Sequence, residues 1–351
     1  MPLARHKFYL LLVVAVVFSG CSLIDEDLSK CGVECNIDYE LQLITNMTTE
    51  LQTQLSMETE VSVAAALRAF LADVFTDYAH DVSLSFYDIQ GDSTRLHYEN
   101  HIMDASQSSY TLHIPLRNYM HLAVANLEEN SEVSITNDET CHGARLEVAR
   151  RDTIDSHNTG VFTARLPMEM REGIDQQFNV SLYMAGAASA LVLDTLGSHI
   201  KDIKVYASGF ADGFNLADST YTFDRNPIVR TKEVIIEDEE AQGADPMCFA
   251  SVTFPSKDIP QPETKTIIET LDPFVSVNAE TALWQLDVYA TLSDGTITRT
   301  VLGIHLPLRP GQAKIIRARM YDDGSAHTFL PYVGASVTLD WTPGSSHDIT
   351  L

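Results

Sequence analysis

The chain contains 351 residues, and 45% of them are hydrophobic, which is enough apolar material for two domains with substantial cores. It carries 49 acidic and 23 basic side chains, giving a formal net charge of −26 at pH 7. Nucleic acid is therefore not expected as a partner, because a polyanion without a basic run gains nothing from counterion release.

Residues 1–20 have the layout of a secretory signal peptide, with basic residues first and an uncharged apolar run from Phe8 to Phe18. This run is shorter than the about 20 apolar residues that a transmembrane helix needs. It leads into Ser19-Gly20-Cys21, which resembles a bacterial lipobox. We expect cleavage before Cys21 and lipidation of its thiol, so that acyl chains hold the mature protein on a membrane. The alternative is an ordinary signal peptide followed by a chance cysteine.

Residues 21–35 are expected to form a lipidated tether in front of the first domain. Their acidic triplet Asp25, Glu26 and Asp27 resembles the export tag that directs Bacteroidetes lipoproteins to the outer face of the cell. A solvated tether without a signal is the alternative, since acidic runs usually have that role. The tag favours a lipid-anchored protein that is exposed on the surface of the outer membrane.

Four cysteines remain besides Cys21, namely Cys31, Cys35, Cys141 and Cys248. Export to an oxidising compartment permits disulfides, but four cysteines allow three pairings and the sequence does not choose among them. A zinc site at Cys31 and Cys35 is disfavoured because no further Cys or His ligand lies nearby. We therefore treat all four as disulfide candidates and expect no metal.

The first half of the mature chain alternates apolar and polar residues, the pattern of half-buried strands. Strands are predicted at 36–44, 82–89, 111–116 and 119–127, with a turn at Gly91-Asp92. Residues 128–156 are polar and predict loops and edge pieces. The segment from Val61 to Tyr78 differs, because its apolar residues recur three and four positions apart. It predicts an amphipathic helix within the first domain, with an apolar face that can cover one face of a sheet.

A change in composition at residues 168–177 predicts the boundary between a first domain, 36–172, and a second domain, 173–351. Beyond it, strands are predicted at 178–184, 190–194, 203–207, 229–236, 249–254, 283–292, 296–302, 313–320 and 334–341. Ser293-Asp294-Gly295 is a strong signal for a hairpin turn. Many short antiparallel strands favour β-sandwiches over a parallel sheet, so the expected class is all-β.

Motifs for catalysis are missing: the chain has no G-x-S-x-G, H-E-x-x-H, P-loop or dinucleotide fingerprint, so we expect neither an enzyme nor a cofactor. The segment that comes nearest to a metal-binding motif is His97-Tyr98-Glu99-Asn100-His101. Its histidines would share a face on a helix, but their surroundings are typical of strand and loop, which argues against a metal site. Paired carboxylates occur at Asp322-Asp323, where Gly324 favours a turn over glycosidase chemistry.

Two further features are candidates for binding sites. Arg150-Arg151 could bind an anion, but acidic neighbours favour a solvated loop. Trp284 and Trp341 could stack on sugars, but both lie in strand patterns, where tryptophan more often belongs to the core.

Several sequence segments together resemble those of the FimB-type fimbrial anchor lipoproteins of Bacteroidales. They are the stretch from Cys21 to Cys31, the strand and turn at 82–92, the turn at 308–312 and the C-terminal strand at 337–344. The resemblance implies two tandem transthyretin-like Greek-key β-sandwich domains. It also implies fimbrial subunits as partners, an anchor or accessory role, and assembly by strand donation.

The C-terminal segment 334–351 is the expected partner strand, with Val337, Leu339 and Trp341 on one face. An internal edge strand is the alternative of equal weight. Two other roles compete with the anchor: a stand-alone surface lipoprotein that binds glycans, and a fimbrial tip adhesin.

Overall fold

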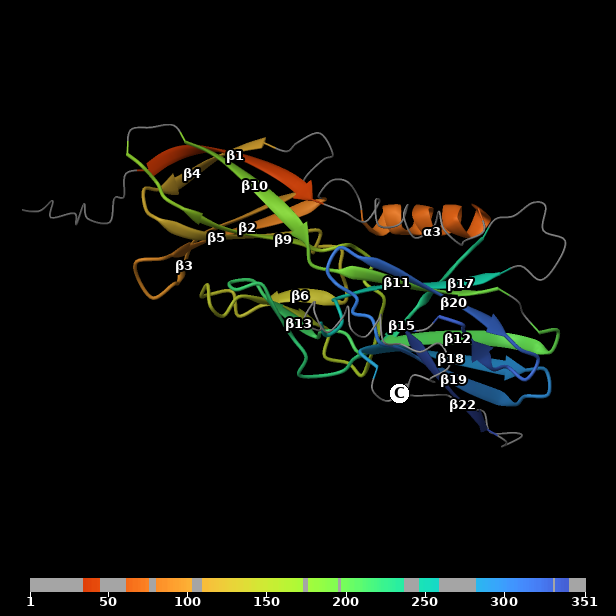
Figure 1. The fold of residues 1–351 in the computed structure, drawn as a ribbon. Helices are drawn as coiled ribbons and strands as arrows, with labels where there is room; N and C mark the ends of the chain where they lie inside the picture. Colours follow the sequence, from red (N-terminus) through yellow and green to blue (C-terminus); the bar gives the residue numbers. More distant parts are fainter. Residues whose placement is uncertain are drawn as a thin grey trace, which may run out of the picture.

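The computed structural model describes residues 34–44, 61–75, 80–102, 109–172, 176–194, 197–236, 246–258, 282–330 and 332–340. In these ranges strands dominate and one helix, α3 (Val61–Val74), is present. The all-β class is confirmed: the strands form four sheets arranged as packed layers (Figure 1). Within the described part of the chain, no helix is both long and apolar enough to cross a membrane.

A seven-stranded sheet in the order β3-β2-β5-β9-β10-β1-β4 forms the first sandwich. Its strands are β1 (Glu34–Ile44), β2 (Asp81–Asp88), β3 (Arg95–Ile102), β4 (Ser109–Pro115), β5 (Tyr119–Ala125), β9 (Phe162–Met168) and β10 (Gln176–Met184). Only Tyr183 and Met184 of β10 pair with β9. The sheet folds over at this narrow junction, so that β10-β1-β4 lies on β2-β5.

A buried polar contact crosses the two layers of the first sandwich. The hydroxyl of Tyr39 on β1 lies 2.6 Å from Nε2 of His121 on β5, although three strand steps separate the two strands in the sheet. Nδ1 of His121 donates to the carbonyl of Ser85 at 3.0 Å, so Nε2 is left to accept from Tyr39. Complete burial lowers the pKa of His121 to about 4, which keeps the imidazole neutral.

The second sandwich packs a five-stranded sheet on a six-stranded sheet. The first has the order β16-β17-β11-β20-β21 and contains β11 (Ala187–Leu193), β16 (Lys232–Val234), β17 (Met247–Thr253), β20 (Ala313–Met320) and β21 (Ala326–His327). The second has the order β22-β19-β18-β12-β15-β8 and contains β8 (Thr153–Asp155), β12 (Ile200–Ser208), β15 (Ile228–Arg230), β18 (Trp284–Leu292), β19 (Ile297–Ile304) and β22 (Val333–Asp340). Side chains such as Leu191, Phe249, Val288 and Leu302 fill the space between them.

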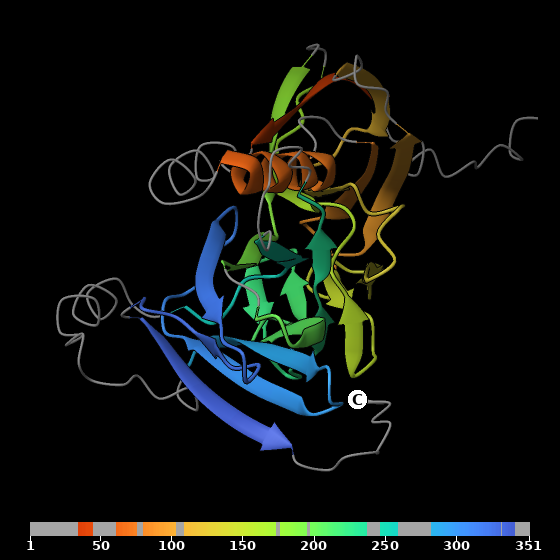
Figure 2. The ribbon, with the colours of Figure 1, turned by 90° about the vertical axis from the view of Figure 1, so that its right-hand side faces the viewer.

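The five-stranded sheet is covered on both faces, and the residues of its central strand are accordingly apolar or small on both sides. All seven residues of β11, AASALVL, are buried, so this strand is a continuous apolar run instead of an alternating one. Its second face packs in one core cluster with α3, through residues such as Val63, Leu67 and Leu71. Both ribbon views place α3 over this sheet (Figures 1 and 2).

The prediction of an amphipathic helix that covers one face of a sheet is thus confirmed, and the sheet that α3 covers belongs to the second sandwich. Periodicity identifies the apolar face of a helix and says nothing about which sheet it will cover. The turn of the chain at Gly160 holds the end of α3, since the Gly160 amide donates to the Val74 carbonyl at 2.8 Å. A Cβ at Gly160 would overlap the ring of Phe75.

A small four-stranded sheet, β14-β13-β7-β6, joins distant parts of the chain. It contains β6 (Val133–Thr136), β7 (Arg145–Val148), β13 (Gly213–Asn215) and β14 (Thr220–Thr222). The sheets do not divide at the expected boundary of residue 173. Beyond that residue, β10 pairs in parallel with β1, and before it, β8 joins the sheet of β15. The change in composition marks a loop, whereas domain membership depends on strand partners.

Candidate functional site: the terminal sheet edge and the arginine cluster

Strand β22 lies at the end of the six-stranded sheet, with β19 on one side and, among the described residues, no strand on the other. The predicted partner-strand residues fall here: Val337 pairs with Thr300 and Leu339 with Thr298. Trp341 lies outside the described residues. In this structure β22 therefore completes a sheet of its own chain while leaving one edge open.

The backbone register shows which groups of β22 face the open edge. The His305 amide donates to the Tyr332 carbonyl at 2.9 Å, next to the paired residues Ile304 and Val333. Alternate residues of an antiparallel strand direct their N–H and C=O groups to opposite sides. Val337 therefore directs its backbone amide and carbonyl outward, away from β19. Such an edge is a template for one further strand.

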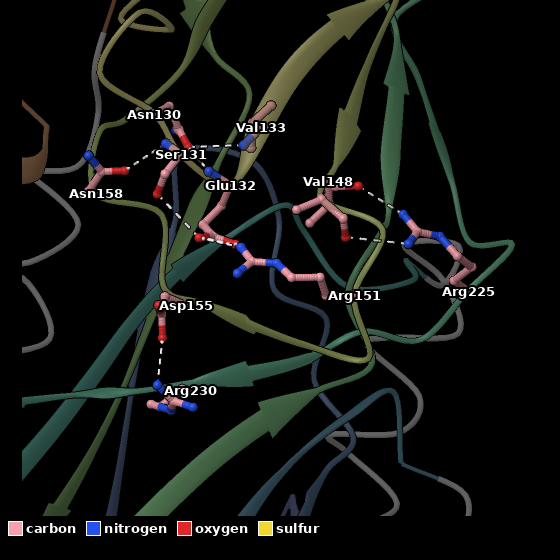
Figure 3. Close-up of polar contacts among 11 residues, drawn as sticks. Asn130, Ser131, Glu132, Val133, Val148, Arg151, Asp155, Asn158, Arg225 and Arg230 are labelled. Atoms are coloured by element: carbon pink, nitrogen blue, oxygen red, sulfur yellow. Dashed lines mark hydrogen bonds and ion pairs between the residues drawn. The ribbon is translucent and has the colours of Figure 1, made fainter. Parts of the chain in front are cut away.

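An arginine cluster lies between the small four-stranded sheet and the turns that lead to β8 and β15 (Figure 3). Arg225 donates through Nε to Asp212 at 3.1 Å and through Nη2 to the Val148 carbonyl at 3.0 Å. Asp212 is buried, with 7% of its side chain exposed, and also accepts the backbone amides of Asp224 and Arg225. This pair fastens β7 to the turn after β14.

A second pair of the cluster anchors the turn between β7 and β8 (Figure 3). One guanidinium nitrogen of Arg151 lies 2.8 and 2.6 Å from the two carboxylate oxygens of Glu132, a side chain that is 3% exposed. Arg150, which is 76% exposed, reaches Glu147 at 3.0 Å. The expected solvated loop thus describes Arg150, while Arg151 neutralises a buried carboxylate.

A cavity of about 440 Å³ opens beside this cluster, and its lining charges balance. Four arginines, at 145, 150, 151 and 225, face four carboxylates, at 147, 152, 212 and 224. Each of the four arginines has an ion pair with a carboxylate. A site that must attract an anion needs uncompensated positive charge, so the cluster holds segments together and does not select a ligand.

The cysteines that were disulfide candidates form no disulfide bond that the described residues show. Cys141 and Cys248 are buried free thiols in separate core clusters, and burial raises the pKa of Cys248 to about 12. They do not pair with each other. Cys35 lies on β1, and its side chain is outside the described residues. Cys21, Cys31 and the acidic triplet 25–27 are outside them as well.

The two histidines of the 97–101 motif share a face after all, because residues two and four positions apart do so on a strand. Glu99 lies between them on β3, 2.7 Å from His97 Nε2 and 2.8 Å from His101 Nε2. Partial burial raises the pKa of Glu99, but these hydrogen bonds outweigh it and the pKa lies below its ordinary value. Among the described residues, no three His, Cys, Asp or Glu side chains are placed to hold one metal ion.

Trp284 and Gly324 have the roles that the sequence favoured, one in the core and one in a turn. Trp284 is 1% exposed and donates its indole N–H to the Leu306 carbonyl at 2.9 Å, so it belongs to the core. Gly324 has a φ of +78° in a turn closed by the Tyr321 amide and the Ser325 carbonyl. The neighbouring carboxylates therefore belong to a turn, as expected.

The family of the chain follows from comparison with known sequences. The model of the fimbrillin-A associated anchor proteins Mfa1 and Mfa2 matches residues 50–300, which is most of the chain. The chain belongs to this family. Its members are fimbrial anchor proteins, so the resemblance drawn from sequence phrases is confirmed, and the protein is a fimbrial accessory protein.

Two solved structures with TM-scores of at least 0.50 show the same fold. A candidate adhesin from Bacteroides thetaiotaomicron aligns with a TM-score of 0.51 and 9% identity, over 84% of this chain and 94% of that one. Another from Bacteroides ovatus gives 0.50 and 10%, over 83% and 92%. The fimbrial anchor protein Mfa2 from Porphyromonas gingivalis gives 0.44 and 11%, over 87% and 98%. A search of curated proteins found no match.

Proposed function

We propose that this family member is a lipid-anchored subunit that fixes a cell-surface fimbrium to the outer membrane. The observation that carries the proposal is the family match over residues 50–300, together with the lipobox-like sequence that ends at Cys21. Several acyl chains on one cysteine bind a membrane far more firmly than a single chain, because each buried methylene contributes about 0.8 kcal/mol. The acidic triplet 25–27 supports export to the outer face.

The role is structural in this proposal, without catalysis. Its mechanical requirement is a junction that dissociates slowly while the fimbrium is pulled. Strand addition meets this requirement, because a strand from a fimbrial subunit forms many backbone hydrogen bonds at once. The outward-facing backbone of β22 supports it, and Val337 lies near the middle of the open edge.

The strand-addition step can be tested with one substitution and a matched control. Val337→Pro removes an outward N–H while leaving the hydrogen bonds from β22 to β19 in place, since proline is tolerated on a free edge. Val337→Ala also removes the branched valine side chain, but it keeps the backbone N–H. Fimbrial subunits should co-purify with the wild type and Val337→Ala and be lost from Val337→Pro, at equal unfolding temperature.

Equal capture of fimbrial subunits by all three proteins would eliminate β22 as the docking edge. If no fimbrial subunit co-purified even with the wild type from cross-linked cells, the anchor function itself would be refuted.

A further inference from the structure

A pocket of about 450 Å³ lies where the seven-stranded sheet narrows, outside both features described above. One wall comes from alternate residues of two neighbouring strands, Thr163 and Arg165 on β9 and Ser181 and Tyr183 on β10. Thr163 and Tyr183 are directly paired, so these four side chains share one face. The opposite wall includes Phe214 on β13 and Tyr221 on β14.

The charge of this pocket differs from that of the rest of the chain. Arg165 is exposed and is the one charged residue that lines the pocket. Within the described residues it has no ion pair, whereas the arginines of the cluster beside the 440 Å³ cavity are all paired. In a chain with a net charge of −26, a cavity with one free cation and no carboxylate favours an anionic ligand.

The aromatic walls are held in place and partly open to solvent. Tyr221 donates its hydroxyl to the Ala185 carbonyl at 2.8 Å, and its ring centre lies 4.7 Å from that of Phe214. Tyr183 is 60% exposed, unusually high for a large side chain on a strand. Fixed aromatic rings offer contact area at a small cost in conformational entropy, which is why tyrosine is common in binding sites.

Hydroxyl groups complete the lining. The side chains of Thr163, Ser181 and Ser219 line the pocket and make no hydrogen bond within the described residues. Ser219 occupies a turn with a φ of +59°, and its amide donates to the Asn215 carbonyl at 2.9 Å, which fixes its position. The pocket therefore combines ring faces, free hydroxyls and one guanidinium.

We propose that this pocket binds a carboxylated sugar, such as a hexuronate or a sialic acid residue of a surface glycan. The apolar face of a pyranose would pack on Tyr183, the hydroxyls would exchange hydrogen bonds with Thr163 and Ser181, and Arg165 would bind the carboxylate through paired N–H groups. A volume of this size suits a small ligand of one or two rings. This activity is independent of the anchor function.

The test compares ligands that differ only in the carboxylate. Digalacturonate and its methyl ester, and sialyllactose and lactose, are titrated into the purified mature chain and followed by ligand-observed NMR and calorimetry. Each acid should bind at least about tenfold more tightly than its neutral counterpart, with the preference shrinking as salt is raised. Arg165→Gln should abolish the preference, and Tyr183→Ala should weaken both ligands of a pair.

The matched control is Arg319→Gln, which removes an exposed arginine on β20, far from the pocket lining, and should bind as the wild type does. Unfolding temperatures of all variants verify that they fold. The proposal is overturned if acid and neutral sugars bind equally, if Arg165→Gln binds as the wild type does, or if an oligoglutamate peptide displaces the sugar at equal concentration. None of these outcomes bears on fimbrial attachment.

Discussion

The buried histidine of the first sandwich predicts a loss of stability in mild acid. In the unfolded chain His121 takes up a proton near its ordinary pKa of 6.5, whereas the folded protein resists protonation until the pKa of about 4. Its contribution is therefore complete above pH 6.5 and is lost as the pH falls toward 4. Between pH 7.5 and 4.5 the loss for one such group is roughly 2.5 kcal/mol.

The variant His121→Gln isolates this effect. Its amide can still donate to the Ser85 carbonyl and accept from the Tyr39 hydroxyl, but it does not titrate. Urea unfolding at pH 7.5 and 4.5 should show that the wild type loses roughly 2.5 kcal/mol more than the variant. His157, whose pKa burial also lowers to about 4, is present in both proteins and cancels. An identical loss in the two proteins would refute the reasoning.

Three further perturbations follow from the packing. Gly160→Ala places a methyl against the Phe75 ring and should destabilise by about 1–3 kcal/mol in thermal unfolding; an unchanged melting temperature would mean that α3 yields easily. Arg225→Gln leaves buried Asp212 and the Val148 carbonyl without their charged donor and should cost about 1–3 kcal/mol by urea unfolding, with retention of full stability contradicting the clamp. Cys248 should resist maleimide in the native protein and react after denaturation, and fast native labelling would contradict its burial.

Local pattern predicted much of the secondary structure. The strand expected at 313–320 is β20, and the Ser293-Asp294-Gly295 turn joins β18 to β19, with Gly295 at a φ of +88°. Both signals depend on a few adjacent residues. The bounds of β3 were not predicted, because His97 and Glu99, which lie opposite the buried residues Phe86 and Leu84 of β2, are polar and hide the usual apolar alternation.

Strand partners could not be predicted, because alternation tells which face is buried and not which neighbour lies beside it. Residues 229–236 were expected as one strand. In the structure β15 ends at Arg230 and β16 begins at Lys232, and the two lie in opposite sheets of the second sandwich. The same limit hid the pocket at Arg165, since its two walls meet only after the chain has folded.

In the proposed function, a lipid on Cys21 would be the fixed end of a fimbrium. The most direct test replaces the thiol by Cys21→Ala in the native cell, with Ser22→Ala as a control that keeps the lipidation site. Electron microscopy of cells and immunoblots of the medium should show this protein and its fimbriae released together from the Cys21→Ala strain only. Fimbriae that stay on Cys21→Ala cells in normal number would contradict the account.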